Sequence, residues 1–165
     1  MQSKLAAFLE SQRRGAQWDF LLRSLVLEAS VALGPEQARG LLVKAGMRAG
    51  QEIALPECDS LAQMEAAANR CWRRLSLGVV SFIERSDCLE IVHEGIPSDE
   101  RASESGLADF LAGLYQQWFV SLGAGERLQV KPCENPDRKT LLYRLAAEKP
   151  VMAAGAVAAT CSEEQ

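Results

Sequence analysis

Metal-binding and redox motifs are missing from this sequence. It contains one histidine, and none of its five cysteines forms the C-x-x-C spacing of metal and redox sites. Scattered cysteines, odd in number, are typical of reduced thiols rather than of a disulfide framework. A zinc site would have to draw its ligands from four distant segments of the chain. We therefore expect no metal and no cofactor.

Long apolar runs are missing as well. The first apolar stretch is interrupted at Glu10, too early for the apolar core of a secretory signal peptide. No stretch approaches the roughly 18–20 apolar residues that span a bilayer. We expect a protein that is made for the cytoplasm and does not insert into a membrane, with periplasmic placement as the alternative.

Positive charge is neither abundant nor concentrated. The chain has 18 Lys and Arg against 22 Asp and Glu, which gives a net charge of −4. Arg13, Arg14, Arg70, Arg73 and Arg74 form the densest basic spots, but they lack the interleaved aromatic residues of a nucleic-acid surface. We expect no nucleic-acid partner.

Catalytic motifs are not recognisable either. No glycine-rich phosphate loop follows an expected strand, and no nucleophile motif accompanies His93. His93 and Glu94 are neighbours in an expected strand, so their side chains point to opposite faces, and we assign His93 a structural or interface role. The carboxylates at Asp99, Glu100 and Glu104 suit solubility better than the paired acids of a glycosidase. We expect no enzymatic activity.

What the sequence does contain, in its first half, is helical periodicity. Apolar residues recur every three to four positions from Trp18 to Leu33, and Phe20, Leu27 and Val31 form a second apolar side. A helix that is apolar on two sides is expected to be buried on two sides, by its own domain and by a neighbouring copy of the chain.

Two further helices carry distinct signals. Gly40, Gly46 and Gly50 fall within the second expected helix, where they indicate either close backbone packing or a weak helix end. Ser60 and Gln63 form a capping-box pattern at the start of a third.

In the second half the apolar period changes to two. Residues 79–84 and 88–93 predict a hairpin, a helix follows over 107–122, and two more strands are expected over 127–131 and 140–145. Helices followed by β-β-α-β-β predict an α+β fold with helices packed on an antiparallel sheet. We divide the chain into a leader over 1–16, a single domain over 17–147 and a flexible tail over 148–165.

Three tryptophans offer aromatic faces that stack on sugar rings in some proteins. Trp18, Trp72 and Trp118 each lie on or beside an apolar helical stripe. This position favours packing in the core or in an interface over contact with carbohydrate.

Two segments resemble the family of the D subunit of bacterial cellulose synthase. Residues 89–97, Leu-Glu-Ile-Val-His-Glu-Gly-Ile-Pro, are similar to a strand and loop of that family. Residues 111–118, Leu-Ala-Gly-Leu-Tyr-Gln-Gln-Trp, resemble its Leu-x-Gly-Leu-Tyr-x-x-Trp helix. The likeness extends over about residues 17–146 and leaves residues 1–14 as an extra leader.

The resemblance implies a non-catalytic accessory subunit of the bacterial cellulose synthase complex. In that family, dimers assemble into an octameric cylinder whose passages are associated with emerging glucan chains and are lined by residues near the N-terminus. The implied partners are further copies of the chain, other synthase subunits and β-1,4-glucan. The glucan-contact candidates are Gln2, Lys4, Gln12, Arg13, Arg14 and Gln17. The oligomer-interface candidates are Trp18, Phe20, Leu27, Val31 and Trp118.

Two alternatives stay open. A cytoskeleton-like organiser would position synthase complexes through protein partners without touching glucan. A small-molecule sensor would use a pocket between helices and sheet with His93 as a ligand, although a lone histidine makes a poor site.

Overall fold

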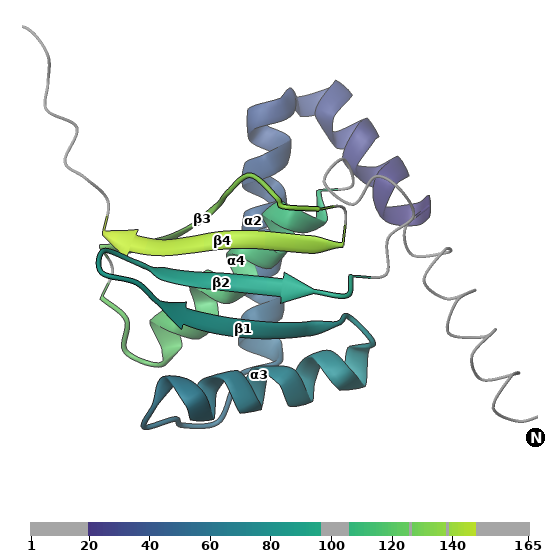
Figure 1. Ribbon diagram of the computed structural model, residues 1–165. Helices are drawn as coiled ribbons and strands as arrows, with labels where there is room; N and C mark the ends of the chain where they lie inside the picture. Colours follow the sequence, from purple (N-terminus) through teal and green to yellow (C-terminus); the bar gives the residue numbers. More distant parts are fainter. Residues whose placement is uncertain (1–19, 97–105, 126, 138, 148–165) are drawn as a thin grey trace, which may run out of the picture.

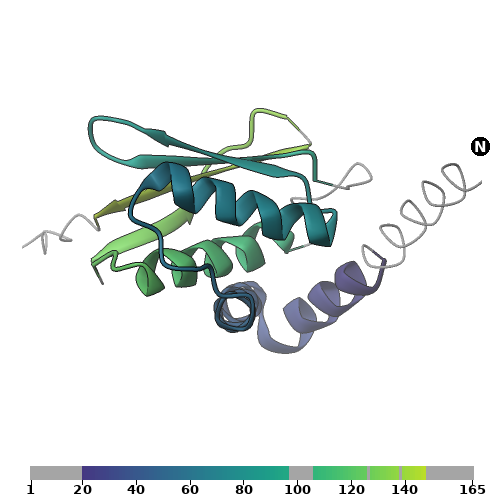
Figure 2. The same ribbon diagram turned by 90° about the horizontal axis from the view of Figure 1, so that it is seen from below.

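The computed structural model describes residues 20–96, 106–125, 127–137 and 139–147. Within these residues, a four-stranded antiparallel sheet has helices packed against one of its faces (Figures 1 and 2). The helices come first, followed by two strands, a helix and two strands. This order confirms the α+β class expected from the sequence. The predicted leader over 1–16 and the predicted tail over 148–165 lie outside the described residues.

The sheet is built from two hairpins that lie side by side. Strands β1 (Val79–Glu84) and β2 (Leu89–Glu94) form the first, and β3 (Leu128–Pro132) and β4 (Thr140–Ala147) form the second. The strand order is β1-β2-β4-β3, so β2 and β4 occupy the centre and β1 and β3 are the edges. Both hairpins were expected from the sequence, and β4 continues two residues beyond the predicted end.

Helix α4 (Leu107–Ser121) covers one face of the sheet, and α3 (Leu61–Leu75) runs alongside its β1 edge (Figures 1 and 2). The predicted cap of α3 is present, because the Gln63 N–H donates to Ser60 Oγ at 3.3 Å. The Gln63 side chain reaches back to accept from the N–H of Asp59 at 3.0 Å. Helix α4 is followed by Gly123, whose φ of 93° is the left-handed conformation that favours glycine.

Helix α2 (Pro35–Glu52) packs on α4 and forms a third layer of the fold. A Cβ atom on Gly46 would lie 1.8 Å from the Phe110 carbonyl oxygen, and one on Gly113 would lie 1.9 Å from the Val43 carbonyl oxygen. The two helix backbones therefore touch, and only glycine fits at these positions. Gly50 is similarly crowded, but a Cβ on Gly40 would have no neighbour within 4 Å. Close packing thus explains two of the three glycines of α2.

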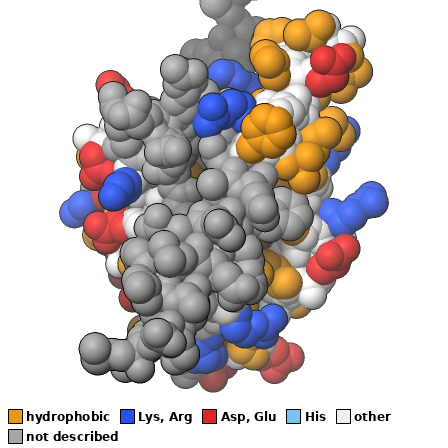
Figure 3. Space-filling model, turned by 90° about the vertical axis from the view of Figure 1, so that its right-hand side faces the viewer, with side chains coloured by type: hydrophobic (Ala, Val, Ile, Leu, Met, Phe, Trp, Pro, Cys, Tyr) orange, Lys and Arg blue, Asp and Glu red, His pale blue; other side chains and the backbone are white. Residues whose placement is uncertain are grey.

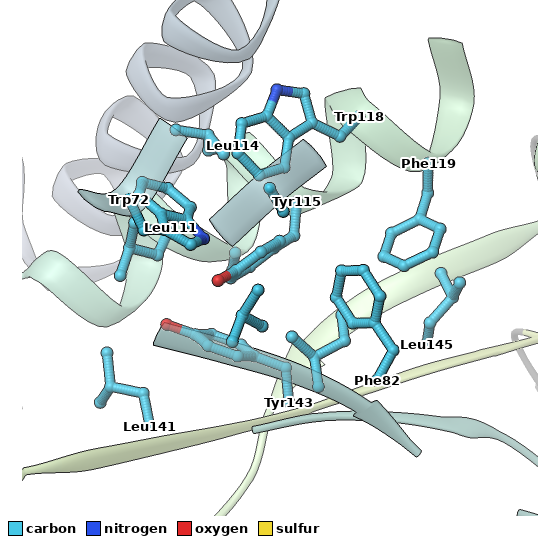
Figure 4. Packing of buried hydrophobic residues seen from close by; sticks show 14 of the residues in the cluster. Trp72, Phe82, Leu111, Leu114, Tyr115, Trp118, Phe119, Leu141, Tyr143 and Leu145 are labelled. Carbon is cyan, nitrogen blue, oxygen red and sulfur yellow. The ribbon is translucent and has the colours of Figure 1, made fainter. Parts of the chain in front are cut away.

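Aromatic side chains fill the space between the sheet and the helices (Figure 4). The Tyr115 ring centroid lies 5.8 Å from those of both Trp72 and Trp118, and 5.7 Å from that of Tyr143. All four side chains are fully buried. The sequence favoured packing in the core or in an interface for the tryptophans, and the structure places Trp72 and Trp118 in the core. Trp18 lies outside the described residues.

Candidate functional site

A helix over residues 20–33 extends away from the body of the molecule, at an angle to α2 (Figure 1). Gly34 lies at the junction with a φ of 85°, and Pro35 begins α2. Proline suits the first helical position because its missing N–H has no helical partner to lose. The Gly34-Pro35 break therefore ends one helix and sets the direction of the next.

This helix displays large apolar side chains to solvent. Phe20 is 73% exposed, Leu25 60%, Leu27 65% and Val31 74%. Figure 3, which faces this end of the molecule, shows hydrophobic side chains gathered at its upper right. Isolated exposed leucines are ordinary, but a contiguous apolar face marks a surface that another molecule covers. Phe20, Leu27 and Val31 lie on the same side of the helix, seven and four residues apart, whereas Leu25 lies on another side. We call the surface formed by Phe20, Leu27 and Val31 the apolar helix face.

The opposite side of the same helix contacts its own chain. Val26 is half-buried, and its side chain lies next to Gly106, as does that of Leu42. The helix therefore has one side against the body of its own chain, as expected, and its other apolar side is uncovered in the single chain. Burial of that second side by a neighbouring copy stays a prediction. Four leucines of the stripes that were expected to pack within the domain are nevertheless exposed: Leu21, Leu25, Leu33 and Leu41.

His93 and Tyr115 form a buried polar pair in the core. The carbonyl of Leu77 can only accept, so His93 Nε2 carries the proton and donates to it. His93 Nδ1 then accepts from the Tyr115 hydroxyl at 2.7 Å. Burial lowers the pKa of His93 and raises the pKa of Tyr115 well above 10, so both groups stay neutral in the folded protein.

This geometry gives His93 a structural role rather than a catalytic or ligand-binding one. Both ring nitrogens have protein partners and the ring is fully buried, whereas Glu94 points to solvent on the other face of the strand. A shallow hollow of about 270 Å³ between α3 and α4 is lined by Leu61, Met64 and Phe119, among others, and His93 does not reach it. The sensor alternative therefore has no ligand position at this histidine.

The buried pair also joins the two segments on which the family resemblance depends. His93 belongs to residues 89–97 and Tyr115 to residues 111–118. Within the second segment, Gly113 touches the backbone of α2, and Trp118 Nε1 donates to the Ile53 carbonyl at 3.1 Å. The signature residues thus hold α4 against its neighbours.

The sequence-predicted site residues fall into three groups. The apolar helix face contains Phe20, Leu27 and Val31. Trp118 lies in the core instead of at the surface, because its indole is fully enclosed and hydrogen-bonded within its own chain. The remaining candidates lie outside the described residues: Gln2, Lys4, Gln12, Arg13, Arg14, Gln17 and Trp18.

Other kinds of site are not found among the described residues. The described part of the chain contains no group of three or more His, Cys, Asp or Glu side chains that could hold a metal ion. None of the described helices combines the length and the apolar character needed to cross a membrane.

Comparison with known proteins identifies the family. No curated protein matches the chain in sequence. The family model of the cellulose synthase D subunit, in contrast, matches residues 4–146. The match begins well before residue 17 and so includes most of the segment interpreted as an extra leader, although the predicted domain boundaries themselves stay a prediction. The chain therefore belongs to the D-subunit family of cellulose synthase.

Proposed function

We propose that this chain is a non-catalytic scaffold that self-associates through its apolar helix face and organises glucan chains for export and packing. Its role in cellulose synthesis, as a subunit of the synthase complex, follows from its family. The observation that carries the self-association is the exposure of Phe20, Leu27 and Val31 on one side of a projecting helix.

Magnitudes favour a contact between copies of the chain. Burying one large apolar side chain contributes about 1.5–3 kcal/mol. The apolar helix face recurs on every copy, so a symmetric pair would bury it twice and gain on the order of 10–20 kcal/mol. The entropic cost of association is roughly 4–15 kcal/mol. The gain is thus of the same size as the cost or larger, which supports a contact between copies at this face, and further contacts would build the expected octamer.

The glucan-contact candidates come shortly before this helix in the chain. Gln17 is three residues from the first described position, Phe20. If the helices of two copies meet in parallel through the apolar helix face, this position of each copy lies at the same end of the pair. Polar side chains repeated by symmetry would offer glucose hydroxyls several weak hydrogen bonds, which suits a polymer that must keep sliding.

The size of the protein in solution tests the self-association. We expect a particle of about eight times the 18.0 kDa of the chain, measured by light scattering or native mass spectrometry. Replacing Leu27 and Val31 together by serine should shift the protein to smaller species. The matched control is Val120→Ser, which changes an exposed valine on α4. A monomeric wild type, or an unchanged size for the double variant, would contradict the proposal.

A second candidate function is that of an organiser that positions synthase complexes without touching glucan. It is favoured by the same apolar helix face, which a different protein could cover. Cells that produce a version without residues 1–14 separate the two functions, with cells that lack the protein as reference. Disordered cellulose bundles in the truncation support glucan guidance, whereas normal bundles support the organiser.

A further inference from the structure

The free edge of β1 is covered by a side-chain amide from α3. Asn69 Nδ2 donates to the Val80 carbonyl at 2.8 Å, and the Val80 N–H donates to Asn69 Oδ1 at 2.8 Å. One carboxamide thus satisfies the outward-pointing donor and acceptor of a single edge residue. A neighbouring strand would make the same two bonds.

The opposite edge of the sheet has the same arrangement. Gln116 of α4 donates through Nε2 to the Leu128 carbonyl at 2.9 Å, and the Val130 N–H donates to Gln116 Oε1 at 2.7 Å. Strand β3 then ends at Pro132, which has no N–H to offer a further strand. Two helices therefore each supply one carboxamide to one edge.

A second group on α3 continues the cover of β1. The N–H of Phe82 donates to Glu65 Oε2 at 2.6 Å. Glu65 and Asn69 are four residues apart on one helical face, a rise of about 6 Å, and Phe82 and Val80 are two residues apart on a strand, about 6.7 Å. The two spacings match, so α3 satisfies successive outward groups of β1.

An uncovered sheet edge is a template on which another strand adds, and natural proteins protect such edges in several ways. We infer that Asn69 and Gln116 close two latent strand-pairing surfaces and so prevent copies of this chain from joining edge to edge. Pairing between unlike edges, β1 of one copy with β3 of the next, repeats without closing and leads to open-ended assemblies, and pairing between like edges joins additional copies in pairs. A scaffold of fixed size needs both kinds of contact to be prevented. The inference concerns the sheet edges and holds whether or not the apolar helix face binds a second copy.

Single substitutions in the full chain test this inference. Asn69→Ala leaves the outward N–H and carbonyl of Val80 without their partner, and Gln116→Ala does the same for the Leu128 carbonyl and the Val130 N–H. We expect both variants to retain the near-ultraviolet circular dichroism of the buried tryptophans. We also expect them to form large species whose thioflavin T fluorescence exceeds that of the wild type by about tenfold or more.

Ser60→Ala is the matched control for stability. It removes the side-chain cap of α3 and weakens the same helix, but leaves the contacts of Asn69 unchanged. We expect this variant to keep the size and dye binding of the wild type. Equal aggregation of Ser60→Ala would overturn the inference, because general destabilisation would then be the cause.

A second substitution tests whether the new assemblies use the β1 edge. A lysine on an edge strand blocks strand addition. Ile83→Lys places one on β1, and Val120→Lys adds the same charge to α4. In the Asn69→Ala background, we expect Ile83→Lys to abolish thioflavin T binding and Val120→Lys to leave it unchanged. If the Asn69→Ala, Ile83→Lys double variant still binds the dye, the assembly contact lies elsewhere and the inference for this edge is overturned.

Two outcomes of the single substitutions count against the inference. Folded Asn69→Ala and Gln116→Ala proteins of wild-type size would overturn it. So would failure of both variants to fold under conditions where Ser60→Ala folds, because the amides would then serve the fold alone. The mass of the wild type is a separate measurement, since a monomeric wild type contradicts the proposed function and leaves the edge inference standing.

Discussion

The imidazole of His93 on β2 and the hydroxyl of Tyr115 on α4 are joined by a hydrogen bond of 2.7 Å in the centre of the core. Because the Leu77 carbonyl holds the other ring nitrogen, the histidine connects the start of the sheet to the helix that covers it. The fixed tautomer and the neutral state of this ring each have a measurable effect on stability.

Removal of the tyrosine hydroxyl should be costly. Tyr115→Phe leaves His93 Nδ1 buried without a donor, and such a loss costs about 1–3 kcal/mol of unfolding free energy. Urea denaturation measures this change. Tyr143→Phe is the control, because the Tyr143 hydroxyl donates at 3.1 Å to the Ala108 carbonyl, which keeps its helical partner within α4. Equal losses in the two variants would contradict a special role for the His93–Tyr115 bond.

Stability should fall with acidification below about pH 6.5. Burial lowers the pKa of His93 in the folded protein below its ordinary value of 6.5, so the unfolded chain binds a proton that the folded chain resists. The folded state therefore keeps its full stability above this pH and loses up to about 1.4 kcal/mol for each pH unit below it, until the folded pKa is reached.

Urea midpoints at pH 8 and pH 5.5 measure this dependence. The chain has one histidine, so His93→Gln removes every imidazole and should flatten the profile. Asp109 acts in the opposite direction and so cannot be the cause of a fall in stability on acidification. Burial raises its pKa from the ordinary value of 3.8, so acidification stabilises the folded state through this group instead. A flat wild-type profile between pH 8 and 5.5 would be inconsistent with a buried neutral His93.

The same glycine-to-alanine change should have opposite effects at two positions. Gly113→Ala forces a Cβ to within 1.9 Å of the Val43 carbonyl oxygen and separates α2 from α4, at a cost of about 3 kcal/mol or more. Gly40→Ala adds a Cβ to the interior of α2 with no neighbour within 4 Å, and should stabilise by about 0.5–1 kcal/mol. Thermal unfolding of the two variants measures both. A loss at Gly40 or a gain at Gly113 would contradict the described contact.

Local signals in the sequence predicted the elements of this fold well. The cap at Ser60, the two hairpins and the helix ending before Gly123 depend on residues close together in the chain, and each was located within about two residues. Contacts between distant segments were not predictable in this way. The apolar periodicity of α2 is the same whether or not Gly46 touches another helix. Only the position of α4 shows that this glycine marks close backbone packing and not a weak helix end.

The candidate site shows the same limit. The sequence predicted two apolar sides for the helix over 20–33. Which side packs on the chain and which is exposed depends on the angle between this helix and α2, and the sequence does not give that angle. Trp118 lies on an apolar helical stripe and was therefore a candidate for the oligomer interface, but the structure places it in the core. The edge contacts of Asn69 and Gln116 gave no sequence signal. Their partners are 11 to 14 residues away, and the strand order decides which backbone N–H and carbonyl groups point away from the sheet.

Dilution should uncover the apolar helix face if a second copy covers it. Hydrogen exchange of residues 20–33 is expected to become faster as the protein concentration is lowered, because this helix has few buried contacts of its own and association stabilises it by mass action. The backbone amides of residues 111–118 are the internal control. They lie in the core of a single chain, and their exchange should not change with concentration until the whole domain unfolds. Exchange of residues 20–33 that is equally slow at every concentration would mean that the chain protects this helix without a partner.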